Sequence, residues 1–233
     1  NFLYRYEQFK KELELPIAKS QEEKAIERLK KLIQPFILRR LKSAVLKDLP
    51  KKIEQVTYSK FDNEQLNIYE AYVNKIRAQL NNQSEDEFGM NKIKILADLT
   101  RLRQICCDPR LCYENYTKGS AKLDTCIDLI ENAKESGHKV LLFSQFTSML
   151  SIIGNALSKK GITYYEITGE TKKDRRIQLV NAFNEDDTTV FLISLKAGGT
   201  GLNLTGADIV IHYDPWWNVA AQNQATDRAH RIG

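Results

Sequence analysis

The chain has 233 residues, of which 42% are hydrophobic and 28% are charged, and its formal net charge is +5. This length and composition are typical of a globular chain with one or two packed cores. No run of about eighteen apolar residues occurs, so no membrane-spanning helix is expected, and the start NFLYRYEQFKK lacks the features of a signal peptide.

The N-terminal part of the chain is basic: residues 1–60 contain 15 Lys/Arg and 8 Asp/Glu. Such an excess favours a polyanionic partner. Many of these lysines alternate with glutamates at helical spacing, as in QEEKAIERLKKL, which suits a solvated helix face equally well. Charge alone therefore does not establish nucleic-acid binding.

Residues 1–118 are expected to be mainly helical, with one extended piece at IEQVTYS. A polar stretch, NNQSEDEFG, separates one helix from the next, KIKILADLTRLRQICC. In the first of these two helices, apolar side chains at helical spacing predict a packed stripe formed by Leu66, Tyr69, Tyr72, Val73, Ile76 and Leu80. Both helices are expected to protrude from the core or to brace it.

From Ser120 onward the pattern changes to alternating helices and strands. Helix AKLDTCIDLIENAKES ends at Gly137, and helix FTSMLSIIGNALSKK ends before Gly161. Helix KDRRIQLVNAF and the apolar runs KVLLFSQF, ITYYEIT, TTVFLISL and DIVIHYD complete the pattern. This alternation predicts an α/β fold with a parallel sheet, helices on both faces and functional loops at the carboxyl ends of the strands. It also divides the chain into domains at residues 1–118 and 119–233.

The cysteines do not have the spacing of a metal site. Cys106, Cys107, Cys112 and Cys126 form no paired CxxC pattern, and the three histidines are scattered. No metal site is therefore expected in this chain, and the cysteines are interpreted as free thiols of a reducing compartment.

Two C-terminal motifs carry potential phosphate chemistry. In SLKAGGTGLNL, Gly198, Gly199 and Gly201 leave backbone N–H groups open to a phosphate, although they also suit a tight turn. In QATDRAHRIG, helical spacing places Gln224, Arg228 and Arg231 on one face, where two guanidinium groups suit a phosphate whose charge grows during reaction. The alternative is an exposed helix with an Asp227–Arg231 pair.

Five segments occur in one order: KVLLFSQF, YEITGETKKDRRIQLVNAF, SLKAGGTGLNL, DPWWN and QATDRAHRIG. Together they resemble the second RecA-like lobe of the Swi/Snf family of DNA-dependent ATPases in helicase superfamily two. PFILRRLKSAVLKDLPKK is similar to the segment that links the two lobes of that family. The resemblance implies a RecA-like lobe at 119–233, and the tail of the first lobe, the linker and a helical protrusion at 1–118.

The resemblance also implies that the chain is a fragment, truncated after its last motif. No GxxxxGK[ST] phosphate loop and no DEAH-like box occur in the sequence, and the family carries both on the first lobe. It implies ATP as the nucleotide, with magnesium ligands on that missing lobe. Arg228 and Arg231 resemble catalytic arginine fingers, while Gln224, Gly199 and Gly201 resemble residues that bind ATP or couple it to nucleic acid.

On the DNA side, hydroxyls, amides and bare backbone N–H groups at the strand ends can line phosphates without reading bases. The expected DNA-binding residues of this kind are Ser144, Gln145, Gly169, Thr171, Lys196, Ala197 and Gly198. Trp217 is added because it resembles a tryptophan of the family that contacts a nucleic-acid strand. Ser144, Thr168 and Thr171 equally suit helix capping, and either Trp216 or Trp217 suits a packed core. His212 and His230 are expected to pack or to orient neighbours, since phosphoryl transfer needs charge and positioning more than a histidine base.

The sequence thus predicts the C-terminal motor lobe of an ATP-dependent double-stranded DNA translocase, inactive as a fragment alone. Its expected partners are duplex DNA, the first RecA-like lobe and protein substrates on DNA, with no membrane. The expected location is the bacterial cytoplasm and nucleoid, with the nucleus as the alternative. Two other functions stay open: an RNA-remodelling helicase lobe, and a non-catalytic scaffold that retains the lobe fold.

Overall fold

The structure is a computed structural model that describes residues 5–38, 52–81, 91–198 and 202–227. The chain forms two compact units, Asn1–Pro50 and Lys51–Gly233, and each is considered by itself. The first unit contains α1 (Tyr6–Phe9), the π-helical turn η1 (Lys10–Glu14), α2 (Leu15–Ser20) and α3 (Glu23–Ile33).

The first unit packs around one fully buried side chain, Leu13. Arg28 of α3 pairs with Glu12 at 3.2 Å, which joins α3 to η1. Gln21 ends α2 in the left-handed region, with a φ of 48°. The apolar side chains of Phe36, Ile37 and Leu38 that follow α3 are exposed.

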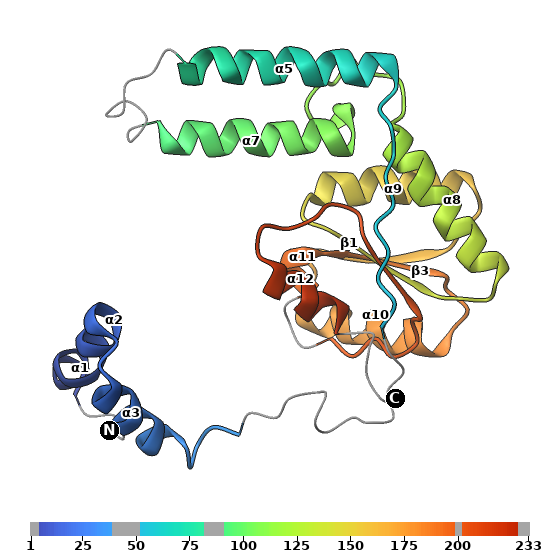
Figure 1. The fold of residues 1–233 in the computed structure, drawn as a ribbon. Coiled ribbons are helices and arrows are strands. Elements are labelled where there is room, and N and C mark those ends of the chain that lie inside the picture. Colours follow the sequence, from blue (N-terminus) through green and yellow to red (C-terminus); the bar gives the residue numbers. More distant parts are fainter. Residues whose placement is uncertain (1–4, 39–51, 82–90, 199–201, 228–233) are drawn as a thin grey trace. The chain divides into compact units, whose positions relative to one another are not determined.

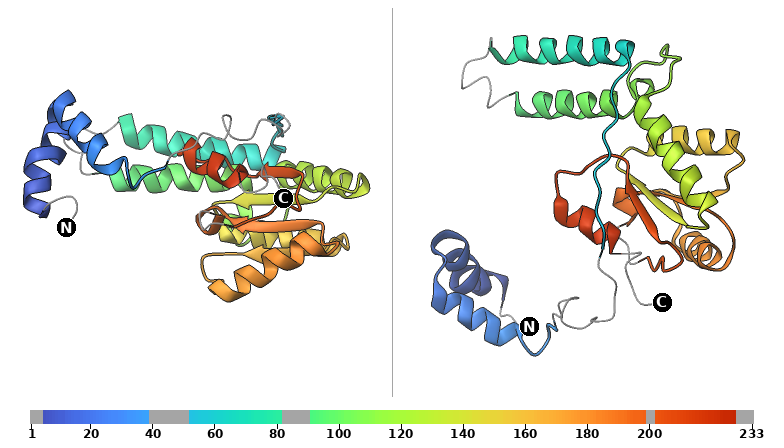
Figure 2. Two further views of the ribbon diagram at one scale, coloured as in Figure 1. Left: turned by 90° about the horizontal axis from the view of Figure 1, so that it is seen from below. Right: turned by 45° about the vertical axis from the view of Figure 1, so that its right-hand side comes forward.

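The second unit begins with an extended segment and a helical hairpin. Residues 52–60 run along the outside of the lobe without regular hydrogen bonding, and Ser59 donates to Thr125 at 3.2 Å. The antiparallel helices α5 and α7 lie side by side in every view (Figure 1, Figure 2). Their bounds are α5 (Asn63–Asn81) and α7 (Lys92–Cys107). The predicted helices and extended piece are thereby confirmed.

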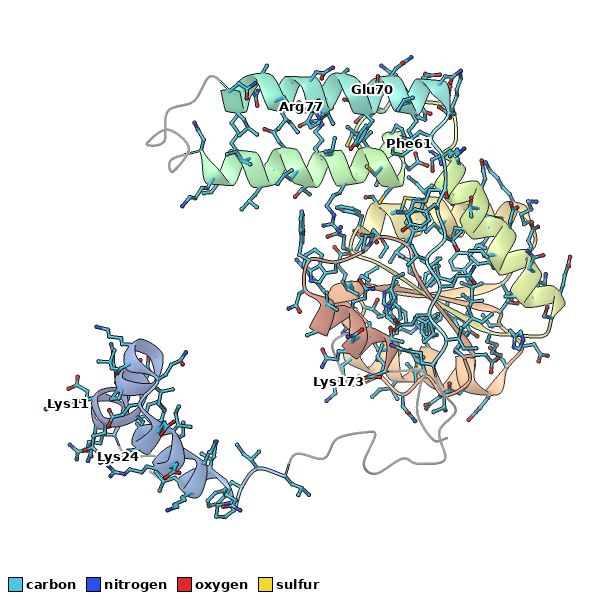
Figure 3. All side chains as sticks on the ribbon, viewed as in Figure 1. Lys11, Lys24, Phe61, Glu70, Arg77 and Lys173 are labelled. Carbon is cyan, nitrogen blue, oxygen red and sulfur yellow. The ribbon has the colours of Figure 1, made fainter. Side chains whose placement is uncertain are left out.

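The predicted apolar stripe of α5 is only partly correct. Tyr72 and Ile76 are buried, but Leu66 and Leu80 are 39% and 36% exposed. Gln65 takes a buried position instead, because its Nε2 donates to the carbonyl of Ile105 at 2.9 Å. A buried amide is stable where such a carbonyl accepts its hydrogen bond. Phe61, labelled at the base of the hairpin in Figure 3, has its ring centre 5.3 Å from that of Tyr69.

The hairpin is anchored to the α/β lobe at the end of α7. The carbonyl of Cys107 accepts hydrogen bonds from Ser120 and Tyr213, both at 3.0 Å. Asp108 is fully buried and accepts from the Arg110 guanidinium at 2.6 Å. Residues 51–118 therefore lie in the same compact unit as the lobe, while the division of the chain into 1–118 and 119–233 stays a prediction.

The α/β lobe contains a four-stranded, wholly parallel sheet in the order β2-β3-β1-β4. The strands are β1 (Val140–Ser144), β2 (Tyr164–Ile167), β3 (Val190–Ser194) and β4 (Ile209–His212). All residues of the central strands β1 and β3 are buried, as expected of parallel strands covered on both faces. The predicted α/β sheet is confirmed.

Helices cover both faces of this sheet (Figure 1). On one face α8 and α9 pack against alternate residues of the central strands, including Val140, Leu142 and Leu192. On the other face α10 packs against Leu141 and Phe191. The helices are α8 (Ala121–Glu135), α9 (Thr147–Lys159), α10 (Lys173–Glu185), α11 (Leu195–Gly198) and α12 (Val219–Thr226).

Glycines end two of these helices as predicted. Gly137 after α8 and Gly161 after α9 have φ values of 75° and 67°, which a side chain would strain. The four cysteines are free, as predicted. No helix within the described ranges combines the length and apolarity needed to cross a membrane.

Candidate functional site

The carboxyl ends of the four strands meet at one edge of the sheet, because all four run in the same direction. Gln145 follows β1, Gly169 and Thr171 follow β2, and Lys196 follows β3. The loop that contains Trp217 follows β4. The structure therefore brings these predicted DNA-binding residues to a single edge of the sheet.

Ser144 at the end of β1 is turned into the protein. Its side chain is only 1% exposed, and its hydroxyl accepts from the backbone N–H of Phe146 at 3.1 Å. This contact stabilises a turn and is not a helix cap, because the N-cap of α9 is Phe146 and no side chain caps it. The hydroxyl holds the turn between β1 and α9 and is not presented to the surface.

Gln145 is fixed by two different neighbours. Its backbone N–H donates to the buried carboxyl of Asp214 at 3.1 Å, and its side-chain oxygen accepts from Arg103 at 3.0 Å. Burial raises the pKa of Asp214 above its ordinary value. The backbone hydrogen bond joins the end of β1 to Asp214, just after β4.

The loop after β2 is ordered by one arginine of α10. The Arg176 guanidinium donates to the carbonyls of Thr171 at 2.7 Å, and of Thr168 and Gly169 at 3.1 Å each. The Thr171 hydroxyl accepts from the Thr168 N–H at 3.0 Å, which closes the turn within the loop. A side chain at Gly169 would meet no atom within 4 Å, so the backbone there is open.

After β3, the short helix α11 alternates between a buried and an exposed side chain. Ala197 is 2% exposed, and its N–H donates to the Ser194 hydroxyl at 3.4 Å. Lys196 is exposed and carries a positive charge at the sheet edge. Lys196 is therefore the side chain of α11 that is available to a phosphate, whereas Ala197 packs. Gly198 ends the described part of this segment.

Trp217 lies on the surface and not in the core. It is 64% exposed, which removes the packed-core alternative for this residue. The Arg103 guanidinium lies 4.9 Å from the centre of the Trp217 ring and 5.6 Å from that of Trp216. Arg103 also donates to the carbonyl of Pro215.

Arg103 belongs to this site, but the sequence did not predict it. It lies on α7, 42 residues before Gln145 and 112 residues before Pro215. In RLRQICC it is one arginine of an ordinary helical pattern, and nothing local distinguishes it from Arg101. Its partners are set only by the docking of α7 beside the strand ends.

The predicted nucleotide-side residues lie in two segments, one directly after α11 and one on or after α12. Gln224 is exposed on α12, whereas Gly199, Gly201, Arg228 and Arg231 lie outside the described residues.

His212 of β4 shares a 2.8 Å hydrogen bond with the Thr226 hydroxyl, which joins the sheet to the end of α12. Burial lowers the pKa of His212 to about 4, so its ring is neutral near pH 7.

Within the described residues there is no cluster of three or more His, Cys, Asp or Glu side chains placed to hold a metal ion. The exposed groups of the edge include a cation at Lys196, an open backbone at Gly169 and an aromatic ring at Trp217. Such groups suit a nucleic-acid backbone, to which a cation gives charge, an open loop gives N–H groups and a ring gives apolar contact.

Two family models match the chain, one in each half. Residues 1–111 match the model of the SNF2-related domain, and residues 121–233 match the helicase conserved C-terminal domain. The SWI2/SNF2 ATPase C-terminal domain of Sulfolobus solfataricus is 32% identical, covering 74% of this chain and 76% of that chain, with a TM-score of 0.65. The chain belongs to the SWI2/SNF2 family. Its α/β lobe has the RecA-like fold.

Two longer relatives cover the whole chain. The SWI2/SNF2 ATPase core of S. solfataricus in complex with double-stranded DNA is 34% identical, covering 100% of this chain and 49% of that chain, with a TM-score of 0.66. An uncharacterised ATP-dependent helicase of Mycoplasma genitalium is 36% identical over 100% of this chain. The chain spans 22% of that helicase, so it corresponds to a limited part of its curated relatives.

Proposed function

We propose that this chain is the C-terminal motor lobe of an ATP-dependent double-stranded DNA translocase. The observation that carries the proposal is the single edge of the sheet where Lys196, the open backbone at Gly169 and the exposed Trp217 gather. A motor that steps along any sequence needs contacts with phosphates, not with base edges. The similarity to the S. solfataricus ATPase core, which was solved in complex with duplex DNA, supports this choice of nucleic acid.

In this proposal ATP is shared with a first lobe. Gln224 is exposed on α12 and faces away from the packed side chain of Ala225, as a residue that contacts a nucleotide must. Gly199 and Gly201 are assigned to the nucleotide from their sequence pattern, and Arg228 and Arg231 to the γ-phosphate. Magnesium ligands and the phosphate loop belong to the first lobe. When bound, ATP supplies the free energy of phosphoryl transfer, and the two arginines stabilise the charge on the transferring group.

DNA binding in this lobe is then a matter of charge and shape. Lys196 pairs with one phosphate, Gly169 offers its backbone, and Trp217 packs against one strand. Gln145, Ser144 and Thr171 set the backbone positions of their loops, and Ala197 and Gly198 allow a close approach after β3. Closure of the two lobes on ATP and their reopening after hydrolysis move this grip along the strand.

Phosphate release provides the test of the proposal. The 233-residue chain, purified free of contaminating ATPases, is expected to release no phosphate from ATP with or without duplex DNA. A longer polypeptide that carries a phosphate loop ahead of this chain is expected to release phosphate faster when duplex DNA is added. Robust DNA-stimulated release from the 233-residue chain would overturn the two-lobe assignment.

The same assay separates the alternatives. Stimulation by RNA and not by duplex DNA in the longer polypeptide would favour an RNA-remodelling helicase. An absence of turnover with either nucleic acid, while duplex DNA still binds, would favour a scaffold. Displacement of a protein bound to DNA tests whether the motor acts on protein substrates.

A further inference from the structure

One side chain of the helical hairpin contacts two of the four loops at the carboxyl edge of the sheet. Arg103 of α7 donates to the side-chain oxygen of Gln145, after β1, at 3.0 Å. The same guanidinium donates to the carbonyl of Pro215, after β4, and lies 4.9 Å from the ring centre of Trp217. A planar guanidinium can do both, because its N–H groups lie in the plane while its face stacks on a ring.

The contacts of Arg103 fix features that are otherwise free to move. Trp217 is 64% exposed, so core packing does not set the orientation of its ring. The amide of Gln145 has two orientations, and Arg103 selects the one in which the oxygen faces the guanidinium. The buried Gln145 Nε2 then makes no hydrogen bond to the described residues.

The same loop continues to the helix that carries Gln224. The Trp216 N–H donates to the Gln222 side-chain oxygen of α12 at 3.2 Å. A continuous set of contacts therefore runs from α7 through residues 215–217 to α12. Contacts of this kind can carry a change at one end to the other, provided that each member is held in place.

We infer that Arg103 is a positioning residue that sets the Trp217 ring and the β1-end loop for duplex DNA and joins them to the helical hairpin. The inference rests on the proposed function, and it assigns to the hairpin a part in holding DNA without contacting it. Arg103 acts through Trp217 and Gln145. Its replacement should therefore change DNA binding only as far as those two groups are displaced.

The neighbouring Arg101 provides a matched control. It lies two residues away on α7, but its guanidinium faces the hairpin, 5.6 Å from the Tyr113 ring centre and 6.0 Å from that of Tyr72. Arg101→Ala removes the same charge from the same helix without touching the strand-end loops. A general effect of charge would appear in both variants, and an effect of position only in Arg103→Ala.

Tryptophan fluorescence of the 233-residue chain reports the geometry directly, because Trp216 and Trp217 are its only tryptophans. Arg103→Ala and Arg103→Lys are both expected to raise the acrylamide quenching constant, since neither retains the stacked planar group. Arg101→Ala should match the wild type. Circular dichroism of each variant verifies folding. Wild-type quenching in a folded Arg103→Lys protein overturns the inference.

A double-mutant cycle on duplex binding at low salt tests the link to function. Arg103→Ala and Trp217→Ala are each expected to weaken binding by about three- to tenfold, and the double variant by less than the product of the two effects, since Arg103 acts in part through Trp217 and coupled residues are non-additive. If the effects of the two single variants multiply in the double variant, the inference is overturned. The proposed function still stands in that case, provided that the wild-type chain binds duplex DNA. A wild-type chain that binds no duplex DNA overturns the proposed function, and this inference with it.

Discussion

Two parts of the carboxyl edge of the sheet are each organised by one arginine, but the arginines come from different distances along the chain. Arg176, which holds the loop after β2, is five residues from Thr171 and eight from Thr168. Arg103, which holds the ends of β1 and β4, is 42 residues from Gln145 and 112 from Pro215. The loop after β2 is held within one strand–helix unit, whereas the ends of β1 and β4 depend on the docking of a separate hairpin.

This difference has a physical consequence for the two parts of the edge. A local guanidinium costs little chain entropy to place, because the same turn and helix that need it also supply it. A distant one is in place only when the hairpin is docked against the lobe. The loop after β2 is therefore held by its own strand–helix unit, whereas the ends of β1 and β4 are held in part by the hairpin through Arg103.

The largest expected effect lies outside both parts of the edge. If these parts hold DNA and perform no chemistry, turnover should depend on Arg228 and Arg231. In a polypeptide that includes a first lobe, Arg228→Ala or Arg231→Ala should lower ATP turnover by roughly 10³-fold or more, with smaller changes in ATP and DNA binding. Arg→Lys should rescue poorly, because an ammonium lacks the planar fork. Near-normal turnover in both Ala variants would reduce the pair to surface charge.

The next prediction compares the stability lost on replacing Arg176, which holds its own loop, with that lost on replacing Arg103, which holds distant loops. Arg176→Ala frees three carbonyls and should destabilise the chain by about 1–2 kcal/mol, which lowers the Tm by roughly 3–6 °C. Arg103→Ala should lower the Tm less, because the loops it holds are exposed and the hairpin has other anchors at Cys107. Differential scanning calorimetry measures both. Arg175→Ala is the control, since Arg175 makes a single 3.4 Å contact with Gln178. A Tm for Arg176→Ala equal to that of Arg175→Ala would remove the distinction.

A smaller effect is expected at Lys196, which neither arginine holds. Lys196→Ala should weaken duplex binding similarly for unrelated sequences and flatten the plot of log K against log salt by roughly one unit, as for one neutralised phosphate. Fluorescence anisotropy over a salt series measures the slope. Lys159→Ala, at the exposed end of α9, should keep the wild-type slope. An unchanged slope in Lys196→Ala would take Lys196 out of the DNA surface.

The effect that is smallest at neutral pH concerns His212, on the β4 side of the edge. Burial lowers the pKa of His212 from 6.5 to about 4, with Lys52 lowering it further and Glu54 opposing. Because the folded state then binds a proton less readily than the unfolded state, His212 destabilises the fold progressively as pH falls from about 6.5 toward 4. Above that range its contribution is constant.

Thermal unfolding between pH 7 and pH 4 measures this contribution. The Tm of the wild type should fall more steeply over this interval than that of His212→Gln, which lacks the titrating group. His138→Gln, at an exposed position, should follow the wild type. Identical slopes for the wild type and His212→Gln would show that His212 is solvated in the folded protein.

Much of the lobe could be predicted from the sequence because its signals are local. Apolar runs such as KVLLFSQF and TTVFLISL are buried in any parallel sheet with two covered faces, and glycines at 137 and 161 end helices through their backbone freedom. The position of Gln145, Gly169 and Lys196 at strand ends follows from the order of elements alone. Their common edge then follows from the parallel direction of the strands.

Tertiary structure alone decided which of these side chains face outward. Ser144 is turned inward by the Phe146 N–H, and Trp217 is kept on the surface beside Arg103, although both residues lie toward the carboxyl edge of the sheet. Gln65 replaced Leu66 in the hairpin core because a carbonyl 40 residues away accepts its hydrogen bond. The reason is the same in each case: periodicity and turn chemistry act over a few residues, whereas these contacts form between segments that the sequence separates and only packing brings together.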